Sequence, residues 1–390
     1  MWYRLPPVGN RISLVRGKGA ARNVEILFSP YSLRLYQSGT AALAAAVIVA
    51  MARRPTTAPE VLLPAYGCPD LISAVLHAGA KPVLVDLAVN TPWLDQTQMV
   101  EKINEHTVAV IAVNFLGIEE SMTGLRAIAD KAGILLIEDS AQCLFESAGD
   151  PKIRGDFIVQ SFGRGKPVSL LGGGAVLWRD QSFRPCLPRV EAAVESNLIG
   201  NTAAWLKILL YNILLTPHIY GLMERVPFLH IGETRFKPLK RILPASAQVI
   251  SGLPTNIGRF RRNRGNAQQW IRAMLDRLCL AQIIDLTCLS TKPVQPDFLR
   301  YPLLVTDNEL RKRLYSALRS AGLGVSRMYP VALPEISGLA GILGGQERCP
   351  RARAFADGIL TLPTHQGVSR RHVVEMEKII VRHCVVQAAC

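Results

Sequence analysis

Short apolar runs alternate with amphipathic stretches through the first half of this chain. Within the amphipathic stretches, apolar residues recur every three or four positions, which is the spacing of a helix. We therefore predict strands at residues 60–64, 81–86, 107–113 and 134–138, and helices at 70–79, 96–104 and 121–132. Strands that alternate with helices form βαβ units, so we expect a mostly parallel sheet. Two further strands are predicted at residues 157–162 and 175–178, without a clear helix between them.

An Ala- and Val-rich stretch at residues 38–53 predicts a buried helix. Ser38 is its expected N-cap, because a serine side chain can accept a backbone N–H of the first turn. Gly39, Thr40 and Ala41 would then present the free N–H groups of the helix start, and such an end attracts phosphate. A plain helix cap without a ligand explains the same residues and remains an alternative.

The second half of the chain has a less regular pattern. Residues 183–298 are helical in character and are interrupted by prolines; beyond them we predict a strand at 300–305, a helix at 308–321, a strand near 323–328 and a closing helix at 369–383. We divide the chain into a large domain at residues 1–285, which includes a helical, apolar segment at about 183–280, and a small C-terminal α/β domain at 286–390.

Composition narrows the class of protein. The chain has 390 residues, of which 49% are hydrophobic, so a buried core is expected and wholesale disorder is not. The eight cysteines are scattered without a C-x-x-C pair, which argues against a zinc cluster and a secreted disulfide framework and favours reduced thiols in a cytoplasm. The basic amino terminus lacks the apolar region of a signal peptide. The seven histidines have no metal-ligand spacing, so no metal is predicted.

The formal net charge of +15 has several explanations. Basic residues concentrate at positions 4–22 and 259–277, where they fit an anionic small substrate such as a nucleotide sugar, or attraction to an acidic membrane surface. A solvated helix face explains the second cluster equally well. We find no nucleic-acid-binding motif, so we expect no nucleic-acid partner.

An acid and a lysine stand at the ends of two predicted strands. Asp139 follows the apolar run at 134–138, and Lys166 comes shortly after the run at 157–162. In open parallel sheets ligands bind at the carboxyl ends of strands. The two side chains could hold opposite sides of pyridoxal phosphate, which needs a lysine to form a Schiff base and an acid facing its ring nitrogen. Asp139 could instead act as a helix N-cap.

Four ordered motifs carry a resemblance to a known family: Ser38-Gly39-Thr40-Ala41-Ala42-Leu43, Ile137-Glu138-Asp139-Ser140-Ala141-Gln142, Ser161-Phe162-x-x-x-Lys166 and Gly172-Gly173-Gly174-Ala175-Val176. The chain resembles the DegT/DnrJ/EryC1/StrS family of PLP-dependent sugar aminotransferases, closely over about residues 36–180 and more faintly over about 300–380. The resemblance implies an α/β fold, the PLP-dependent transferase fold type I, with a large, mostly parallel-sheet domain and a smaller C-terminal α/β domain.

The resemblance also implies roles for single residues. Lys166 would be the catalytic Schiff-base lysine and Asp139 the partner of the ring nitrogen. Gln142 would contact the ring hydroxyl of the cofactor, and Ser161 would join Gly39, Thr40 and Ala41 around its phosphate. Tyr329 lies in a stretch that resembles the substrate side of the site, where family members often carry His at the position of Pro334.

Two parts of the family pattern match poorly. The aromatic residue that often stacks on the cofactor falls where this chain has Cys68, and Tyr66 is the alternative. The loop that family members contribute to the partner subunit maps poorly onto residues 232–236, although Arg235 could serve the phosphate.

The expected function is therefore transfer of an amino group from an amino acid, L-glutamate in the first instance, to a keto sugar carried on a nucleotide, in polysaccharide or glycoconjugate biosynthesis. The expected assembly is a cytoplasmic homodimer. Alternatives are another PLP-dependent reaction on an amino acid, for which Cys68 or Cys143 could be a reactive thiol, and a non-catalytic, membrane-associated protein with the same fold.

The apolar segment at residues 203–215 needs its own explanation. At 13 residues it is too short to span a bilayer, which takes about 20. Lys207 and Asn212, its strongly polar positions, do not share one face, so the helix should be covered nearly all round. We predict a dimer-interface or core helix, with peripheral membrane contact as the alternative.

Overall fold

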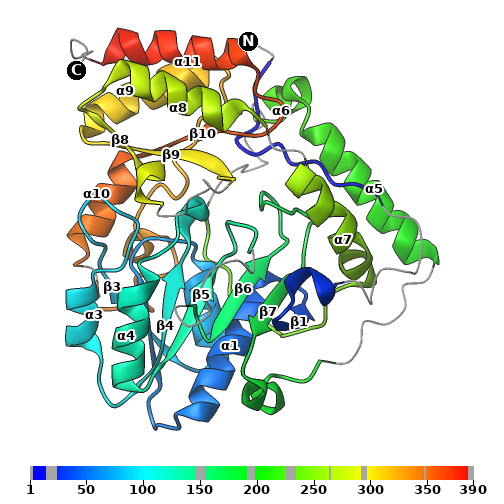
Figure 1. Ribbon diagram of the computed structural model, residues 1–390, viewed down its shortest axis with the longest axis vertical. Coiled ribbons are helices and arrows are strands. Elements are labelled where there is room, and N and C mark those ends of the chain that lie inside the picture. Colours follow the sequence, from blue (N-terminus) through cyan, green and yellow to red (C-terminus); the bar gives the residue numbers. More distant parts are fainter. Residues whose placement is uncertain are drawn as a thin grey trace.

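The computed structural model describes residues 3–14, 24–145, 154–190, 198–224, 234–262, 265–290, 297–346 and 348–384. Its strands form a seven-stranded sheet and a three-stranded sheet. In Figure 1 the larger sheet lies in the lower half of the molecule and the smaller sheet lies above it. The chain therefore folds as an α/β protein around two sheets.

The larger sheet has the strand order β1-β7-β6-β5-β4-β2-β3. Its strands are β1 (Ser32–Tyr36), β2 (Glu60–Pro64), β3 (Lys81–Val85), β4 (Thr107–Val113), β5 (Leu135–Asp139), β6 (Phe157–Ser161) and β7 (Gly174–Trp178). Strands β3, β2, β4, β5 and β6 are parallel, while β7 runs antiparallel to β6 and β1 antiparallel to β7. The predicted mostly parallel sheet is confirmed; β1 was not predicted.

Helices cover both faces of this sheet. They are α1 (Gly39–Arg53), α2 (Asp70–Ala78), α3 (Gln96–Lys102) and α4 (Met122–Ala132). α1 packs against α2 and the sheet, and its alanines and valines are almost entirely buried. α3 and α4 pack on the opposite face, around Leu62, Val110 and Leu125. Ser38 caps α1 as predicted, since its Oγ accepts the Ala41 N–H at 3.1 Å.

The smaller sheet is antiparallel and consists of β8 (Ile283–Asp285), β9 (Arg300–Val305) and β10 (Ile359–Pro363). It is accompanied by α8 (Ala267–Leu278), α9 (Asn308–Ser320), α10 (Pro350–Gly358) and α11 (Arg370–His383). The predictions of β9, α9 and α11 are confirmed, whereas α10, β8 and β10 were not predicted.

The strand predicted near residues 323–328 is wrong. That stretch makes a single bridge, from Ser326 to Thr361. Gly322 and Gly324 have φ angles of +74° and +69°, in the left-handed region that glycine adopts readily. These two residues turn the backbone away from an extended conformation, so the apolar alternation around them does not form a strand.

The division of the chain at residues 285 and 286 remains a prediction. α8 and β8 lie before that position, yet Ile271 and Met274 of α8 share a core with Leu303 of β9 and Met376 of α11. Leu5, near the amino terminus, belongs to the same core. The core around the smaller sheet thus includes residues from both ends of the chain.

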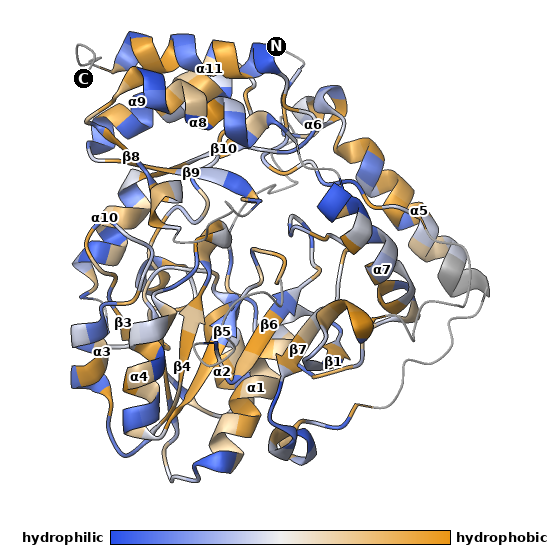
Figure 2. Ribbon diagram, viewed as in Figure 1, coloured by the Kyte–Doolittle hydropathy of each residue, from blue (hydrophilic) through white to orange (hydrophobic). Residues whose placement is uncertain are grey.

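Three further helices are α5 (Leu198–Leu214), α6 (Pro217–Met223) and α7 (Ala247–Arg262). α7 lies beside the larger sheet, whereas α6 lies near the smaller sheet and α11 (Figure 1). α7 packs its apolar side, including Val249 and Leu253, against β6 and β7. α5 lies outside α7 at the edge of the molecule (Figure 1) and is coloured largely as hydrophobic in Figure 2. Short 3-10 helices occupy Ile26–Phe28, Phe115–Gly117, Gln181–Cys186, Leu286–Leu289 and Leu333–Glu335.

Residues 3–14 connect the two parts of the molecule. Leu5 lies in the core of the smaller sheet, while Ile12 lies in the core between α7 and the larger sheet. The Asn212 side chain accepts the Ile12 N–H and donates to its carbonyl, both at 2.9 Å. Asn256 makes the corresponding pair with Ser13, at 2.8 and 3.2 Å. These contacts fix the segment against α5 and α7.

Candidate active site

A pocket of about 230 Å³ lies where β5 and β6 end and α1 begins. Six of the residues predicted to hold the cofactor line it: Gly39, Thr40, Asp139, Gln142, Ser161 and Lys166. Ala41 does not, because its N–H is bonded to Ser38 and its side chain lies in the core. Residues that are distant in the sequence thus gather at the carboxyl ends of parallel strands, where ligands bind in such sheets.

Asp139 is the last residue of β5 and its side chain is 9% exposed. Its Oδ1 accepts the Ala141 N–H at 2.9 Å. Burial raises the pKa of the Asp139 carboxyl, while the charge of Lys166 acts in the opposite direction. Asp139 does not cap a helix, because residues 140–145 contain a short turn and no helix.

Lys166 lies in the loop that follows β6. The loop is closed by the Leu170 N–H, which donates to the Phe162 carbonyl at 2.7 Å. Asn10 holds it from outside, since its Nδ2 donates to the Pro167 carbonyl at 3.0 Å. Among the residues that the structure describes, the Lys166 amine has no hydrogen-bond or ion-pair partner. A fixed loop therefore presents an uncommitted amine to the same pocket as Asp139.

Glycines let three chain segments meet beside this pocket. A Cβ on Gly39 would lie 2.7 Å from the Cβ of Ser161, and one on Gly174 would lie 2.4 Å from the Ser38 carbonyl oxygen. Both contacts are too short for a larger residue. The N–H groups of Gly39 and Thr40 have no partner in the described part of the chain. Together with the Ser161 hydroxyl, they form a cradle suited to a phosphate group.

Gln142 connects the pocket to a group of aromatic side chains. Its Oε1 accepts the Leu116 N–H at 2.8 Å, and its Nε2 donates to the Tyr329 hydroxyl at 3.0 Å. Tyr329 therefore stands behind Gln142 and does not itself line the pocket. The Tyr66 hydroxyl in turn donates to the Tyr329 carbonyl at 3.0 Å, and the Tyr66 ring packs against Phe115 and Phe355.

Of the two residues considered for stacking on a cofactor ring, Cys68 lines the pocket and Tyr66 does not. Burial raises the pKa of the Cys68 thiol to about 12. This cysteine is accordingly a neutral thiol at neutral pH, not a thiolate.

The segment compared with a partner-subunit loop is only partly described. Gly232 and Glu233 lie outside the described residues. Arg235 is exposed and does not line this pocket, while Phe236 packs against the main core.

Sequence reasoning missed two charged residues of the pocket, Asp70 and Arg164. Asp70 is the first residue of α2 and follows Cys68 by two positions; Arg164 precedes Lys166 by two. The sequence did offer a signal for both residues, since each lies two positions from a residue already predicted to be in the site.

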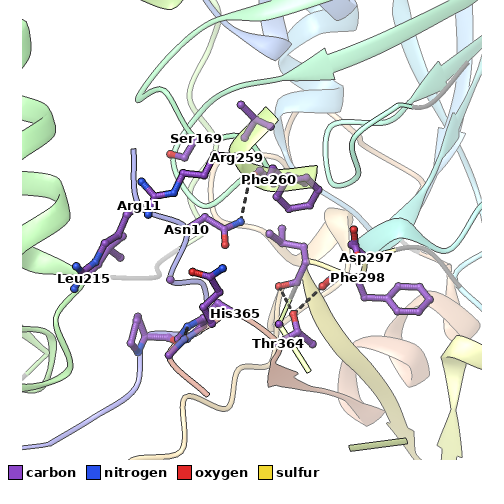
Figure 3. A pocket seen from close by; sticks show the side chains of 18 of the residues that line it. Asn10, Arg11, Ser169, Leu215, Arg259, Phe260, Asp297, Phe298, Thr364 and His365 are labelled. Carbon is purple, nitrogen blue, oxygen red and sulfur yellow. Dashed lines mark hydrogen bonds between the residues drawn. The ribbon is translucent and has the colours of Figure 1, made fainter. Parts of the chain in front are cut away.

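A cleft of about 300 Å³ lies on the other side of the lysine loop and is lined by Pro167, Val168 and Ser169. Figure 3 shows Asn10, Arg11 and Arg259 close together in it, with Phe298 and Thr364 across from them.

His365 also lines the cleft. Its Nε2 donates to the Pro6 carbonyl at 2.9 Å, and its Nδ1 accepts the Gly367 N–H at 3.1 Å. Burial lowers the pKa of His365 to about 4, so the two arginines are the positive groups there at neutral pH.

The DegT/DnrJ/EryC1/StrS aminotransferase family model matches residues 35–186. GDP-perosamine synthase of Vibrio cholerae is 27% identical to this chain over 212 residues, which are 52% of this chain and 54% of that enzyme. The dTDP-3-amino-3,4,6-trideoxy-alpha-D-glucose transaminase of Streptomyces venezuelae is 25% identical over 315 residues, 80% of this chain and 73% of that enzyme. The chain spans about half the length of the first of these relatives.

Solved structures share the whole fold at lower identity. A sugar aminotransferase from Streptococcus pneumoniae, solved in its PLP form, superposes on this chain with a TM-score of 0.67 at 19% sequence identity. The match includes 97% of this chain and 94% of that protein. Helicobacter pylori PseC, an aminotransferase involved in pseudaminic acid biosynthesis, has a TM-score of 0.68 and 15% identity, and covers 98% of both chains. At this identity the likeness establishes the fold, which confirms the predicted architecture.

Proposed function

We propose, from the premise that this chain belongs to the DegT/DnrJ/EryC1/StrS aminotransferase family, that it is a PLP-dependent aminotransferase. It would move an amino group from an amino acid, L-glutamate in the first instance, to a keto sugar carried on a nucleotide. The observation that supports this most directly is the pairing of Asp139 and Lys166 in one pocket beside a phosphate-sized cradle. The product would serve polysaccharide or glycoconjugate biosynthesis.

The residues of the pocket fit pyridoxal phosphate. The N–H groups of Gly39 and Thr40 and the Ser161 hydroxyl would hold its phosphate. Asp139 would face the ring nitrogen, and Gln142 the ring hydroxyl. When bound, the cofactor supplies an electron sink for the charge that develops at the Cα of the amino acid.

The protein side chains would divide the remaining work. Lys166 would hold the cofactor covalently between turnovers. Once the donor amine has displaced it, the free Lys166 amine would take the proton from Cα and carry it to the C4′ carbon of the cofactor. The Asp139 carboxylate would keep the ring nitrogen protonated. The wall of the pocket at Gln142, which Tyr329 supports from behind, would limit the access of water to this proton.

Arg11 and Arg259 are the proposed contacts for the carrier of the sugar. They lie in the cleft that begins at Pro167, directly after the catalytic lysine. Guanidinium groups are well suited to phosphate oxygens. Two arginines in a cleft of about 300 Å³ are compatible with the diphosphate of a nucleotide sugar.

We further propose a cytoplasmic homodimer. The outer face of α5 supports a covering partner, because Leu206, Leu209, Leu210 and Ile213 are 66%, 50%, 53% and 42% exposed. A core position for this helix, one of the two explanations first predicted, is contradicted by those exposures. Peripheral contact with a membrane remains the alternative to a second subunit.

The membrane alternative rests on composition. In the described part of the chain, no single helix is long and apolar enough to cross a bilayer; the pair Thr202–Leu214 and Pro217–Met223 passes by length and composition together but is bent by 92°. Flotation with anionic vesicles distinguishes the two: co-flotation at low salt would favour the membrane, and its absence the subunit interface.

A reaction that depends on a reactive cysteine is less well supported. The raised pKa of Cys68 leaves it protonated at neutral pH, and a thiol is a poor nucleophile compared with a thiolate.

The test of the proposed function is incubation of the purified, PLP-loaded protein with L-glutamate and a panel of nucleotide-linked keto sugars. We expect 2-oxoglutarate and an amino sugar in equal amounts with at least one sugar. Visible absorbance of the loaded protein separates an enzyme from a scaffold. Failure to bind PLP would refute the proposal outright.

A further inference from the structure

Arg300 is a half-buried cation that has no carboxylate partner among the residues that the structure describes. It is the first residue of β9, and its Nη1 donates to Ser326 Oγ at 2.7 Å. Its Nε is buried and has no hydrogen-bond partner, and no carboxylate of the described chain pairs with it. An arginine stays charged, and a charge removed from water without a partner is unfavourable. The fold therefore keeps a positive charge without a carboxylate partner at a partly buried position, with its Nε withdrawn from solvent.

The position of Arg300 relates it to the candidate active site. Side chains alternate along a strand, and Tyr301, Leu303 and Val305 of β9 lie in the core of the smaller sheet. Leu304 lies instead in the core of the larger sheet. Arg300 shares the face of Leu304, so it points toward the larger sheet and its pocket.

Three tyrosines act on the charge of Arg300. Tyr66, Tyr220 and Tyr329 are the groups that influence the charge of Arg300 most after burial, which lowers the pKa of the guanidinium. Burial raises the pKa of Tyr220 to about 12 and raises those of Tyr66 and Tyr329 as well. All three are neutral at neutral pH and provide no counter-ion.

Tyr329 separates Arg300 from the pocket. Its hydroxyl contacts Gln142 and Cys68, both of which line the pocket. On its other side Arg300 adjoins the cleft, because Leu299 precedes it and Thr364 follows its strand partner Pro363. Arg300 thus stands at the junction of the lysine pocket and the cleft.

The backbone beside this junction has an uncommon conformation. Met328, directly before Tyr329, has a φ of +57° and is not a glycine. The Met328 N–H donates to Ser326 Oγ, the same oxygen that holds Arg300. Backbone in this sparsely populated region is enriched at ligand sites. The turn that aims Tyr329 at Gln142 is therefore tied to the arginine.

We propose that Arg300 receives a carboxylate of the amino donor, with Tyr329 moving aside to admit it. This inference rests on the proposed transaminase function, since only that reaction brings an amino acid to the pocket. A guanidinium binds a carboxylate through two parallel hydrogen bonds and would be neutralised by it. The phosphates of a nucleotide carrier are left to the cleft, where Arg11 and Arg259 lie.

The test uses glutarate, which keeps both carboxylates of glutamate but has no amine and cannot react. Its binding to the PLP-loaded protein is measured by calorimetry, with inorganic phosphate as a second probe. We expect Arg300→Met to weaken glutarate binding about ten- to hundredfold, as for a lost charged hydrogen-bonded pair, and to leave phosphate binding unchanged. Arg300→Lys should keep part of the affinity, because it retains the charge without the fork.

Arg311→Met is the matched control. Arg311 is buried more fully than Arg300, and its Nε donates to the Asp357 carbonyl at 2.6 Å and its Nη2 to Asn308 Oδ1 at 3.1 Å. Its removal should lower the melting temperature and leave glutarate binding intact, whereas Arg300→Met should not lower it.

Equal glutarate affinity in wild type and Arg300→Met, or no glutarate binding by the wild type, would overturn the proposal. So would a selective loss of phosphate binding. Absence of cofactor absorbance would instead refute the transaminase function, so the two failures are distinguishable.

Discussion

The strand ends around the pocket bury polar groups, whereas α5 exposes apolar ones. Asp139, Gln142 and Glu138 are each less than 10% exposed, while Leu206 of α5 is 66% exposed. Both arrangements are unfavourable for an isolated folded chain. They differ in how the chain compensates for them.

The buried polar groups have partners within the fold. Glu138 pairs with Arg154 at 2.9 Å and accepts a hydrogen bond from Asn114 at 2.8 Å. Ile208 and Asn212 attach α5 to the rest of the molecule, but its outer leucines contact solvent. The family match ends at residue 186, before this helix begins. The buried polar groups beside the pocket are thus compensated within one chain, whereas we propose that the outer face of α5 is covered from outside it.

The largest effect is expected at the lysine of the pocket. Lys166→Ala should lower transamination at least about a thousandfold, because it removes both the covalent attachment and the proton carrier. Borohydride reduction of the wild type, followed by peptide mapping, should locate the cofactor on Lys166. Lys207→Ala, on exposed α5, is the control and should keep activity. Modification of any lysine other than Lys166 would contradict the assignment.

A smaller loss is expected at the carboxylate. Asp139→Asn should keep the fold and the cofactor but slow removal of the Cα proton about a hundred- to thousandfold, since a neutral amide does not stabilise the charged ring. The rate is measured in single turnovers with L-glutamate deuterated at Cα, where a larger isotope effect is expected. A near-normal rate would leave Asp139 with the structural role of holding the Ala141 N–H.

Much of the pocket could be predicted from the sequence, because its residues lie at the ends of strands and helices that short stretches of apolar residues already indicate. Asp139 is the last residue of an apolar strand, and Ser38 caps an alanine-rich helix. Each of these positions is set by short-range structure. The resemblance to a family then related motifs that lie far apart along the chain.

Arg300 could not be recognised in this way. Its role depends on a face of β9 meeting Tyr66 and Tyr329, which belong to other parts of the chain. The exposure of α5 could not be predicted either. The spacing of apolar residues shows which faces of a helix need to be buried, but not whether the same chain or another surface buries them. Both features arise only from tertiary packing.

The third prediction tests the covering surface of α5. Leu206→Ser with Leu210→Ser should weaken a dimer about a hundredfold or more, given about 1.5–3 kcal/mol for each buried leucine. Light scattering over a dilution series measures this change. The substitution of exposed Val374 by Ser is the control, since it lies on α11 in the other part of the molecule. A wild type that stays monomeric and co-floats with anionic vesicles would assign this face to a membrane.

The smallest effect is expected at Glu120, a buried carboxylate away from the pocket. Its substitution tests whether a buried carboxylate outside the pocket contributes to activity. Glu120 is 4% exposed and accepts the N–H groups of Leu94 and Ser121 at 3.0 and 2.9 Å. Burial raises its pKa from 4.5 to about 8. The native state therefore keeps a proton that the unfolded chain has released between pH 4.5 and 8, so this group lowers stability as pH rises through that range.

Glu120→Gln removes this titration. Relative to the wild type, its free energy of unfolding should rise with pH across the same window, by at most about 1.4 kcal/mol per pH unit, while transamination stays unchanged. Urea unfolding at several pH values measures the difference. A constant difference would mean that Glu120 titrates normally, and a loss of activity would extend the functional site beyond the pocket. The expected result would separate the buried carboxylate Glu120, which affects only stability, from the buried Asp139 beside Lys166, which affects activity. Buried charge would then serve catalysis beside the pocket, while the exposed apolar face of α5 serves association.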